Sequence, residues 1–214
     1  KRLQIELSVA VARTKFAKAA DAAMRTFLDF IDPRKQCPAA YVAAQENHLK
    51  IIRLLHKMRA DLDKPNTADG GNPAAIAAKK GHTAMVQLLY DLGADVHRAA
   101  NDGSRPIHVA AREGHDKTAL LILSLRASVD AQDNEGRTPC WAAAADGHAK
   151  ALRLLILHGA DVERAPYKNQ DGPLYVAAGL NKPECIAALA TAKANLNAYH
   201  TDGCSPIGVA AQEG

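Results

Sequence analysis

The chain has few aromatic residues and no long apolar run, although hydrophobic residues make up 48% of its 214 positions. Since no run of about eighteen apolar residues occurs, no segment is expected to insert into a membrane. The first apolar stretch is interrupted by charged residues and does not read as a secretory signal. Many of the apolar residues are alanine, which favours helices and lets them approach one another closely. The composition therefore indicates stacked helices rather than one bulky core.

Paired cysteines are also missing. No CxxC spacing that would suggest a zinc site occurs, because the four cysteines lie far apart, at Cys37, Cys140, Cys185 and Cys204. We expect reduced thiols in an intracellular protein of the cytoplasm, with the nucleus as a further location. The chain begins without Met and ends within a pattern at Gly214, so we expect it to be a fragment.

An excess of one charge sign is confined to the beginning of the chain. Up to position 36 there are eight basic and four acidic residues, and nineteen of each sign follow. A surface that binds nucleic acid needs a basic stripe that displaces counterions, and a balanced chain does not provide one. We therefore expect no nucleic-acid partner.

What the sequence does contain is a repeat of 33 or 34 residues. Six copies align on a proline position, with successive separations of 34, 33, 33, 34 and 33 residues, at Ala39, Pro73, Pro106, Pro139, Pro173 and Pro206. Proline starts a helix well, because its φ is preset and no hydrogen bond is lost at the first helical position. A period near 33 residues predicts a solenoid of helical hairpins.

Other positions of each copy support two helices per repeat. A pair of small residues, such as Ala110-Ala111, follows the proline position and lets the first helices of adjacent copies pack closely. Glycine and histidine then end the first helix, as at Gly114-His115, because glycine adopts the left-handed conformation. The second helix carries a buried apolar pair, such as Leu88-Leu89.

The segments Arg137-Thr138-Pro139, Gly147-His148 and 154–162 resemble the ankyrin repeat, as do the copies that begin at Pro73 and Pro106. The resemblance covers Gln36 to the end of the chain. It implies an all-α repeat solenoid, made of stacked helix-turn-helix units with short β-hairpin loops. The implied domain spans 37–214, with about five full repeats and the first helix of a sixth. Such a scaffold binds partners through its variable residues.

Residues 1–36 fit the repeat poorly. Seven apolar residues in this segment follow helical spacing: Phe16, Ala20, Ala23, Met24, Phe27, Leu28 and Ile31. Because an end repeat exposes an apolar face, we expect 1–36 to be a helical capping segment. The alternative is a helix that binds a partner or a membrane surface, which its basic polar face favours.

Three copies depart from the pattern at the end of the second helix. Arg59, Arg126 and Lys193 stand where other copies have Gly93 and Gly159. If the backbone is left-handed there, each non-glycine residue costs about 1 kcal/mol.

No enzymatic pattern is found. A Gly-rich phosphate loop, a nucleophile elbow and an HExxH motif are absent. Four of the nine histidines occupy one position in successive copies, and helices stacked about 8–10 Å apart hold them too far apart to share a metal. We expect no catalysis, no cofactor and no metal.

By the resemblance, loop tips and first helices form a concave partner-binding surface. Trp141 stands where the family usually has histidine, between His108 and Tyr175 of neighbouring copies. Because Trp, Tyr and Arg dominate interface centres, we expect a contact patch around it. Alternatively, Trp141 and Tyr175 only pack against adjacent loops. The candidate partner-binding residues are Trp141, Tyr175, Tyr167, His108, Arg112, Glu113, Arg137, Asn101, Asp102, Asn134, Glu135, Asp146, Lys79, Lys80 and Leu180.

The predicted function is a non-catalytic, monomeric scaffold or targeting module for protein–protein interaction. The sequence does not identify the protein partner. The alternative is a regulatory or substrate-recruiting segment of a larger enzyme, channel or bacterial effector.

Overall fold

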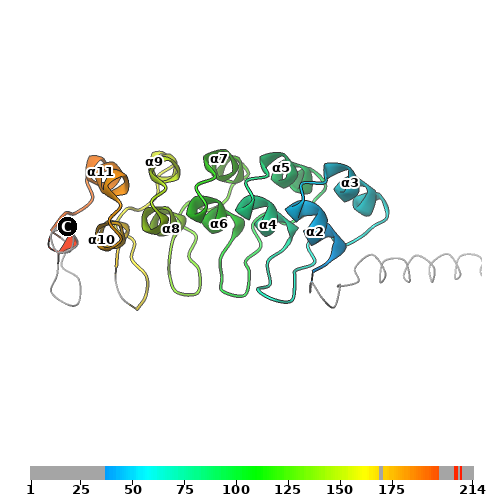
Figure 1. Ribbon diagram of the computed structural model, residues 1–214, viewed down its shortest axis with the longest axis horizontal. Coiled ribbons are helices and arrows are strands. Elements are labelled where there is room, and N and C mark those ends of the chain that lie inside the picture. The colour runs from blue at the N-terminus through cyan, green and yellow to red at the C-terminus, as the bar shows by residue number, and fades with distance from the viewer. Residues whose placement is uncertain (1–36, 169–170, 198–204, 207, 209–214) are drawn as a thin grey trace, which may run out of the picture.

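The computed structural model describes residues 37–168, 171–197, 205–206 and 208, and the expected cap 1–36 lies outside them. Helices form two parallel rows along a single stack (Figure 1). The inner helices are α2 Ala39–Gln45, α4 Pro73–Lys79, α6 Pro106–Arg112, α8 Pro139–Asp146 and α10 Pro173–Gly179. The outer helices are α3 Leu49–Lys57, α5 Thr83–Asp91, α7 Asp116–Ser124, α9 Ala149–Leu157 and α11 Pro183–Thr191. One inner and one outer helix make each of five repeats, which confirms the predicted all-α solenoid.

The inner helices begin as the proline positions predict. Proline is the first residue of α4, α6, α8 and α10. The residue before it supplies a cap in two repeats, because the side chains of Asn72 and Thr138 accept hydrogen bonds from the N–H groups of Ala75 and Trp141 at 3.0 and 3.1 Å. These bonds satisfy N–H groups that a helix start leaves without a partner.

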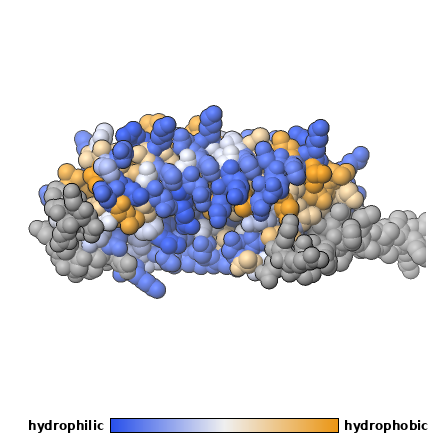
Figure 2. Space-filling view, in the orientation of Figure 1, coloured by the Kyte–Doolittle hydropathy of each residue, from blue (hydrophilic) through white to orange (hydrophobic). Residues whose placement is uncertain are grey.

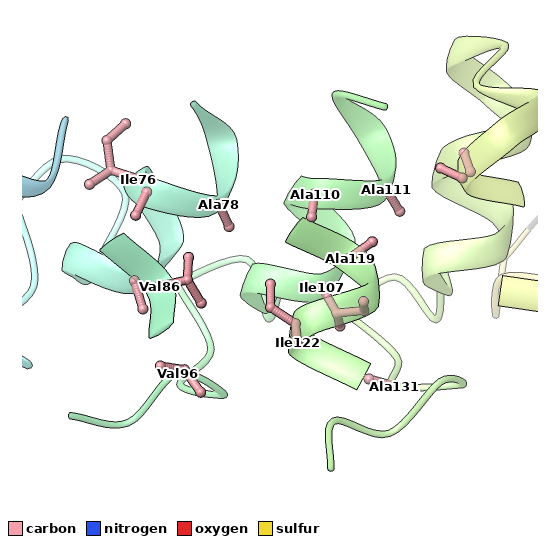
Figure 3. Packing of buried hydrophobic residues seen from close by; sticks show 14 of the residues in the cluster. Ile76, Ala78, Val86, Val96, Ile107, Ala110, Ala111, Ala119, Ile122 and Ala131 are labelled. Atoms are coloured by element: carbon pink, nitrogen blue, oxygen red, sulfur yellow. The ribbon is translucent and has the colours of Figure 1, made fainter. Parts of the chain in front are cut away.

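The core is a narrow layer of small and branched side chains between the two rows. Each inner helix packs on the inner helices of its neighbours and on the outer helix of its own repeat. The alanine pairs lie at these contacts, and Ala110 and Ala111 are both 0% exposed (Figure 3). Ile107 and Ile122 fill the space between the rows of the third repeat. The small residues are thus what permits the close stacking.

The helix ends contain left-handed residues of two kinds. Arg59, Arg126 and Lys193 have φ of 61°, 71° and 64°, as the comparison with Gly93 and Gly159 predicted. A Cβ at Gly93 or Gly159 would meet no atom within 4 Å. These positions therefore carry backbone strain alone, without a steric clash, when a side chain is present.

Finger-shaped loops join each outer helix to the next inner helix, and we call them fingers: 64–72, 98–105, 131–138 and the described part of 165–172. They stand side by side below the inner row (Figure 1). The expected β-hairpin loops take this form, but no β-strand is assigned in the residues that the structure describes. Backbone hydrogen bonds close the fingers, as between Ala100 N–H and the Ser104 carbonyl at 2.8 Å.

Candidate partner-binding groove

The tips of neighbouring fingers are bonded to one another. Each tip donates a backbone N–H to a carbonyl of the preceding tip over 2.9–3.0 Å, in the pairs Asn101–Asp69, Asn134–Asp102 and Tyr167–Glu135. The Asn134 side chain adds a bond from Nδ2 to the Asn101 carbonyl at 2.9 Å. These inter-repeat bonds turn separate loops into one continuous row, so the side chains at the tips are presented at a regular spacing.

Tight turns orient the acidic side chains of the tips. The Asp69 carboxylate accepts the Gly71 N–H at 2.8 Å, and the Asp102 carboxylate accepts the Ser104 N–H at 2.9 Å. Partial burial raises the pKa of Asp102, but hydrogen bonds from Ser104 and the charge of Arg112 outweigh it and hold the pKa below its usual value. Asp102 is therefore a fixed anion at neutral pH.

A hollow opens between these fingers and the inner helices α4 and α6. Its floor is apolar and includes Ala75, Ile76 and Val109. Asp69 and Asp102 line the finger side, and Lys79, Arg112 and Glu113 line the helix side. Neither Lys79 nor Arg112 has an ion-pair partner among the described residues. The hollow thus joins an apolar floor to two anions on the finger side, and to two cations without an ion-pair partner and one carboxylate on the helix side.

Arg137, in contrast, has its charge satisfied within the chain. Its Nε bonds the Asp133 carboxylate at 2.7 Å, and its guanidinium contacts Glu135 at 3.0 Å. The guanidinium carbon also lies 5.7 Å from the ring centre of Trp141, a cation–π distance. Arg137 therefore orders the surface around Trp141, and it is less available to a partner than Arg112.

Trp141 is half-buried and bonded to the next finger. Its Nε1 donates to the Asp171 carbonyl at 2.8 Å. The packing that we considered as the alternative is thus present, and the ring still has an accessible part. On the neighbouring finger, Tyr167 is 64% exposed, and its hydroxyl donates to Gln132 Oε1 at 3.1 Å. The two aromatic side chains are held in place while remaining accessible.

His108 is fully buried and cannot contact a partner, unlike our expectation. Its Nδ1 accepts the Arg105 N–H at 3.1 Å, so the proton resides on Nε2, which lies 2.9 Å from the Ala131 carbonyl and 3.1 Å from that of Arg137. Burial lowers the pKa of His108, although Asp133 opposes this effect. The neutral ring supports the finger from beneath.

The remaining predicted residues fall into two groups. Arg112 and Tyr175 are half-buried. The others are exposed: Asn101, Asp102, Asn134, Glu135, Lys79, Lys80, Glu113, Asp146 and Leu180. Our sequence prediction missed Ile76 and Val109 in the floor of the hollow. Their shared position, three residues after the proline position, was the signal that could have identified them.

The histidine at the start of each outer helix has a structural role in the central repeats. Nε2 of His82 lies 3.1 Å from the Gln45 carbonyl, and Nε2 of His115 lies 3.0 Å from the Lys79 carbonyl. Both bonds join a repeat to the inner helix of the preceding one. In the part of the chain that is described, no group of three His, Cys, Asp or Glu residues is placed to hold a metal ion.

Two of the cysteines are buried thiols. Cys140 and Cys185 are both 0% exposed. Burial raises the pKa of both, to about 12 for Cys140, so neither thiol is a reactive thiolate at neutral pH.

None of the described helices has the length and apolar content that a membrane span requires.

Stacked helical hairpins joined by fingers define a repeat solenoid that offers an extended surface rather than a catalytic cleft. A family model of ankyrin repeats, in three copies, matches residues 15–100, 40–133 and 107–200. The chain belongs to the ankyrin-repeat family, whose members are generally non-catalytic modules for protein–protein interaction. The first match begins at residue 15, within the segment that we expected to be a separate cap. No curated protein matches the chain.

Proposed function

We propose that the chain is a non-catalytic scaffold or targeting module, which binds a protein partner along the groove between its fingers and inner helices. The observation that carries this proposal is the hollow at α4 and α6, where Lys79 and Arg112 lie opposite Asp69 and Asp102 above an apolar floor. A polypeptide is the ligand class that supplies apolar, acidic and basic groups along one extended line.

The equivalent positions of α8 and α10 have a different character. Trp141 and Tyr175 occupy the positions that Ala75 and His108 hold in the preceding repeats, and Ala145 and Gly179 follow where Lys79 and Arg112 stood. We therefore propose a partner segment with charged side chains over α4 and α6, and an apolar side chain near Trp141.

The bonded row of fingertips supports this role physically. A groove that is already ordered loses little conformational entropy when a partner binds, and binding affinity benefits from that preorganisation. The buried Cys140 and Cys185 thiols suit a reducing compartment, so we place the protein in the cytoplasm or the nucleus. We also take the protein to be a monomer.

The experiment that tests this proposal compares two variants of the chain that carry the same change in net charge. One combines Lys79→Glu with Arg112→Glu in the groove, and the other combines Lys117→Glu with Lys150→Glu on exposed positions of the outer helices. Proteins captured by the wild type should be lost from the groove variant and kept by the outer variant. Equal capture by all three proteins contradicts the proposal.

A further inference from the structure

The outer helix of the first repeat exposes an apolar residue at a position that every later repeat buries. Ile51 is the third residue of α3 and is 44% exposed. The third residue of each later outer helix is 0% or 1% exposed: Met85, Thr118, Ala151 and Cys185. The position is thus normally enclosed, whatever side chain occupies it.

Leu54, one turn further along α3, is also the most exposed residue at its position. It is 51% exposed, whereas the equivalent Leu88 and Ala188 are 4% and 5% exposed, and the equivalent Leu121 and Leu154 are half-buried. The adjacent Leu55 is 6% exposed, so α3 itself is correctly packed on its own repeat. Among the described residues, none covers the side of α3 that carries Ile51 and Leu54.

The reason lies in the stacking. Every other outer helix packs against a preceding outer helix: α5 on α3, α7 on α5, α9 on α7 and α11 on α9. No described helix precedes α3 in this row. Figure 2 shows apolar surface over the α3 end of the stack, whereas polar residues cover the middle. We name the exposed side of α3, with Ile51 and Leu54, the open end face.

We propose that the segment 16–31 of this chain covers the open end face and continues the row of outer helices by one element. This inference does not depend on the partner that the groove binds. The segment carries seven apolar residues at helical spacing, which give the single stripe that such a cover requires. As a helix, it would be about 24 Å long, which exceeds the roughly 14 Å of α3.

Charge is compatible with this segment as the occupant. The helix α3 contains three basic residues, Lys50, Arg53 and Lys57, and no acidic ones. Residues 16–31 contain two acidic and two basic residues, so the segment has no net charge that would repel a basic helix.

Two more observations support an intramolecular cover. The family model matches from residue 15, so the repeat pattern extends into the segment. Only residues 32–36 separate position 31 from Cys37, where the described part begins. A short tether gives the segment a high effective concentration at α3, which favours it over a second copy of the chain.

The test uses the full chain and pairs an end-face variant with an exposed control. Leu54→Ala should lower the Tm by roughly 5 °C, because a covered leucine is truncated. It should also raise the hydrogen exchange of residues 16–31. Leu157→Ala, at an outer-helix position that is 84% exposed, should change neither. Alanine is the better helix former in both variants, so a difference between them reports packing.

A second variant tests the coupling from the other side. Phe27→Ala should raise the exchange of α3, and its Tm shift should add less than fully to that of Leu54→Ala, because both changes remove the same contact. The inference is overturned if residues 16–31 exchange as an unprotected chain in the wild type. It is equally overturned if Leu54→Ala acts no more strongly than Leu157→Ala, or if protection of α3 rises with protein concentration, as binding of a second copy requires.

Discussion

The two halves of the inner row, α4 with α6 and α8 with α10, use the same backbone to present different chemistry. Over α4 and α6, Lys79 and Arg112 face the acidic tips, and small Ala75 leaves room for the hollow. Over α8 and α10, Ala145 and Gly179 take the cationic positions, and Trp141 fills the position of Ala75. A few positions per repeat thus set the character of the surface, while the alanine pairs and the left-handed conformation at the ends of the outer helices are kept.

The largest expected effect is a loss of partner affinity when the two cations over α4 and α6 are reversed. Lys79→Glu with Arg112→Glu should weaken partner binding about 100-fold, at about 1.4 kcal/mol for each reversed contact. The Tm should fall only slightly, because neither side chain has an ion-pair partner among the described residues, although Arg112→Glu removes a charge that stabilises the Asp102 carboxylate. Titration calorimetry with a captured partner measures the loss. If binding is unchanged, the charged half has no role in recognition.

Trp141→Ala tests the apolar half. It should weaken binding about tenfold and reduce the free energy of unfolding by about 2 kcal/mol, because the bond to the Asp171 carbonyl and the contact with Arg137 are both lost. Trp141→Phe keeps a ring but removes the N–H, so it should retain most of the binding. A variant that loses stability while its affinity stays intact would assign Trp141 to packing alone.

Gly114→Ala tests the contact between the third and fourth repeats, where the two halves meet. A Cβ at Gly114, where φ is 69°, would lie 2.4 Å from Nδ1 of His148 in the next repeat. Both strain and a clash result, so we expect a loss of about 2 kcal/mol in urea unfolding. Gly159→Ala should lose only about 1 kcal/mol, because its Cβ would meet nothing. Equal losses would show that the contact with His148 does not matter.

Arg126→Gly separates the scaffold from the groove. It relieves a left-handed arginine with φ of 71° and should raise the free energy of unfolding by about 1 kcal/mol, or roughly 3 °C in Tm. Partner affinity should stay the same, because Arg126 does not line the hollow between the fingers and the inner helices α4 and α6. A lower Tm in thermal unfolding would mean that the arginine side chain is itself stabilising.

The smallest expected effect is a pH dependence of stability that comes from His108. Trp141, at the same position of the next repeat, does not titrate. The folded-state pKa of His108 is lowered by burial, so the unfolded chain binds more protons between the two pKa values. Stability from this residue is complete above about pH 6.5 and declines as the pH falls below that value. Urea unfolding at pH 7.5 and 5.5 measures the decline, which His108→Gln should reduce. An identical decline in that variant would assign it to other groups.

The scaffold could be predicted well from the sequence, because each of its positions has a local cause. Pro106 starts its helix, Ala110 and Ala111 are buried, and Arg126 adopts the left-handed conformation that its alignment with Gly159 indicated. Such features follow from one residue and its place in the period. The spacing of the repeat is therefore enough to predict them.

The surface could be predicted only in part, because contacts between repeats decide which side chains remain available. His108 was expected at the surface, but two carbonyls of the next finger enclose its ring. Arg137 and Arg112 were both expected to contact a partner, yet Asp133 and Glu135 satisfy the charge of Arg137. Neither difference is visible in the spacing of the repeat.

Hydrogen exchange of the full chain, with and without a captured partner, tests the central claim most directly. The account predicts protection at the finger 98–105, at α4 and α6, and around Trp141, with little change in α5, α7 and α9. Protection confined to those outer helices would contradict the account, because it would place the partner on the opposite side of the stack.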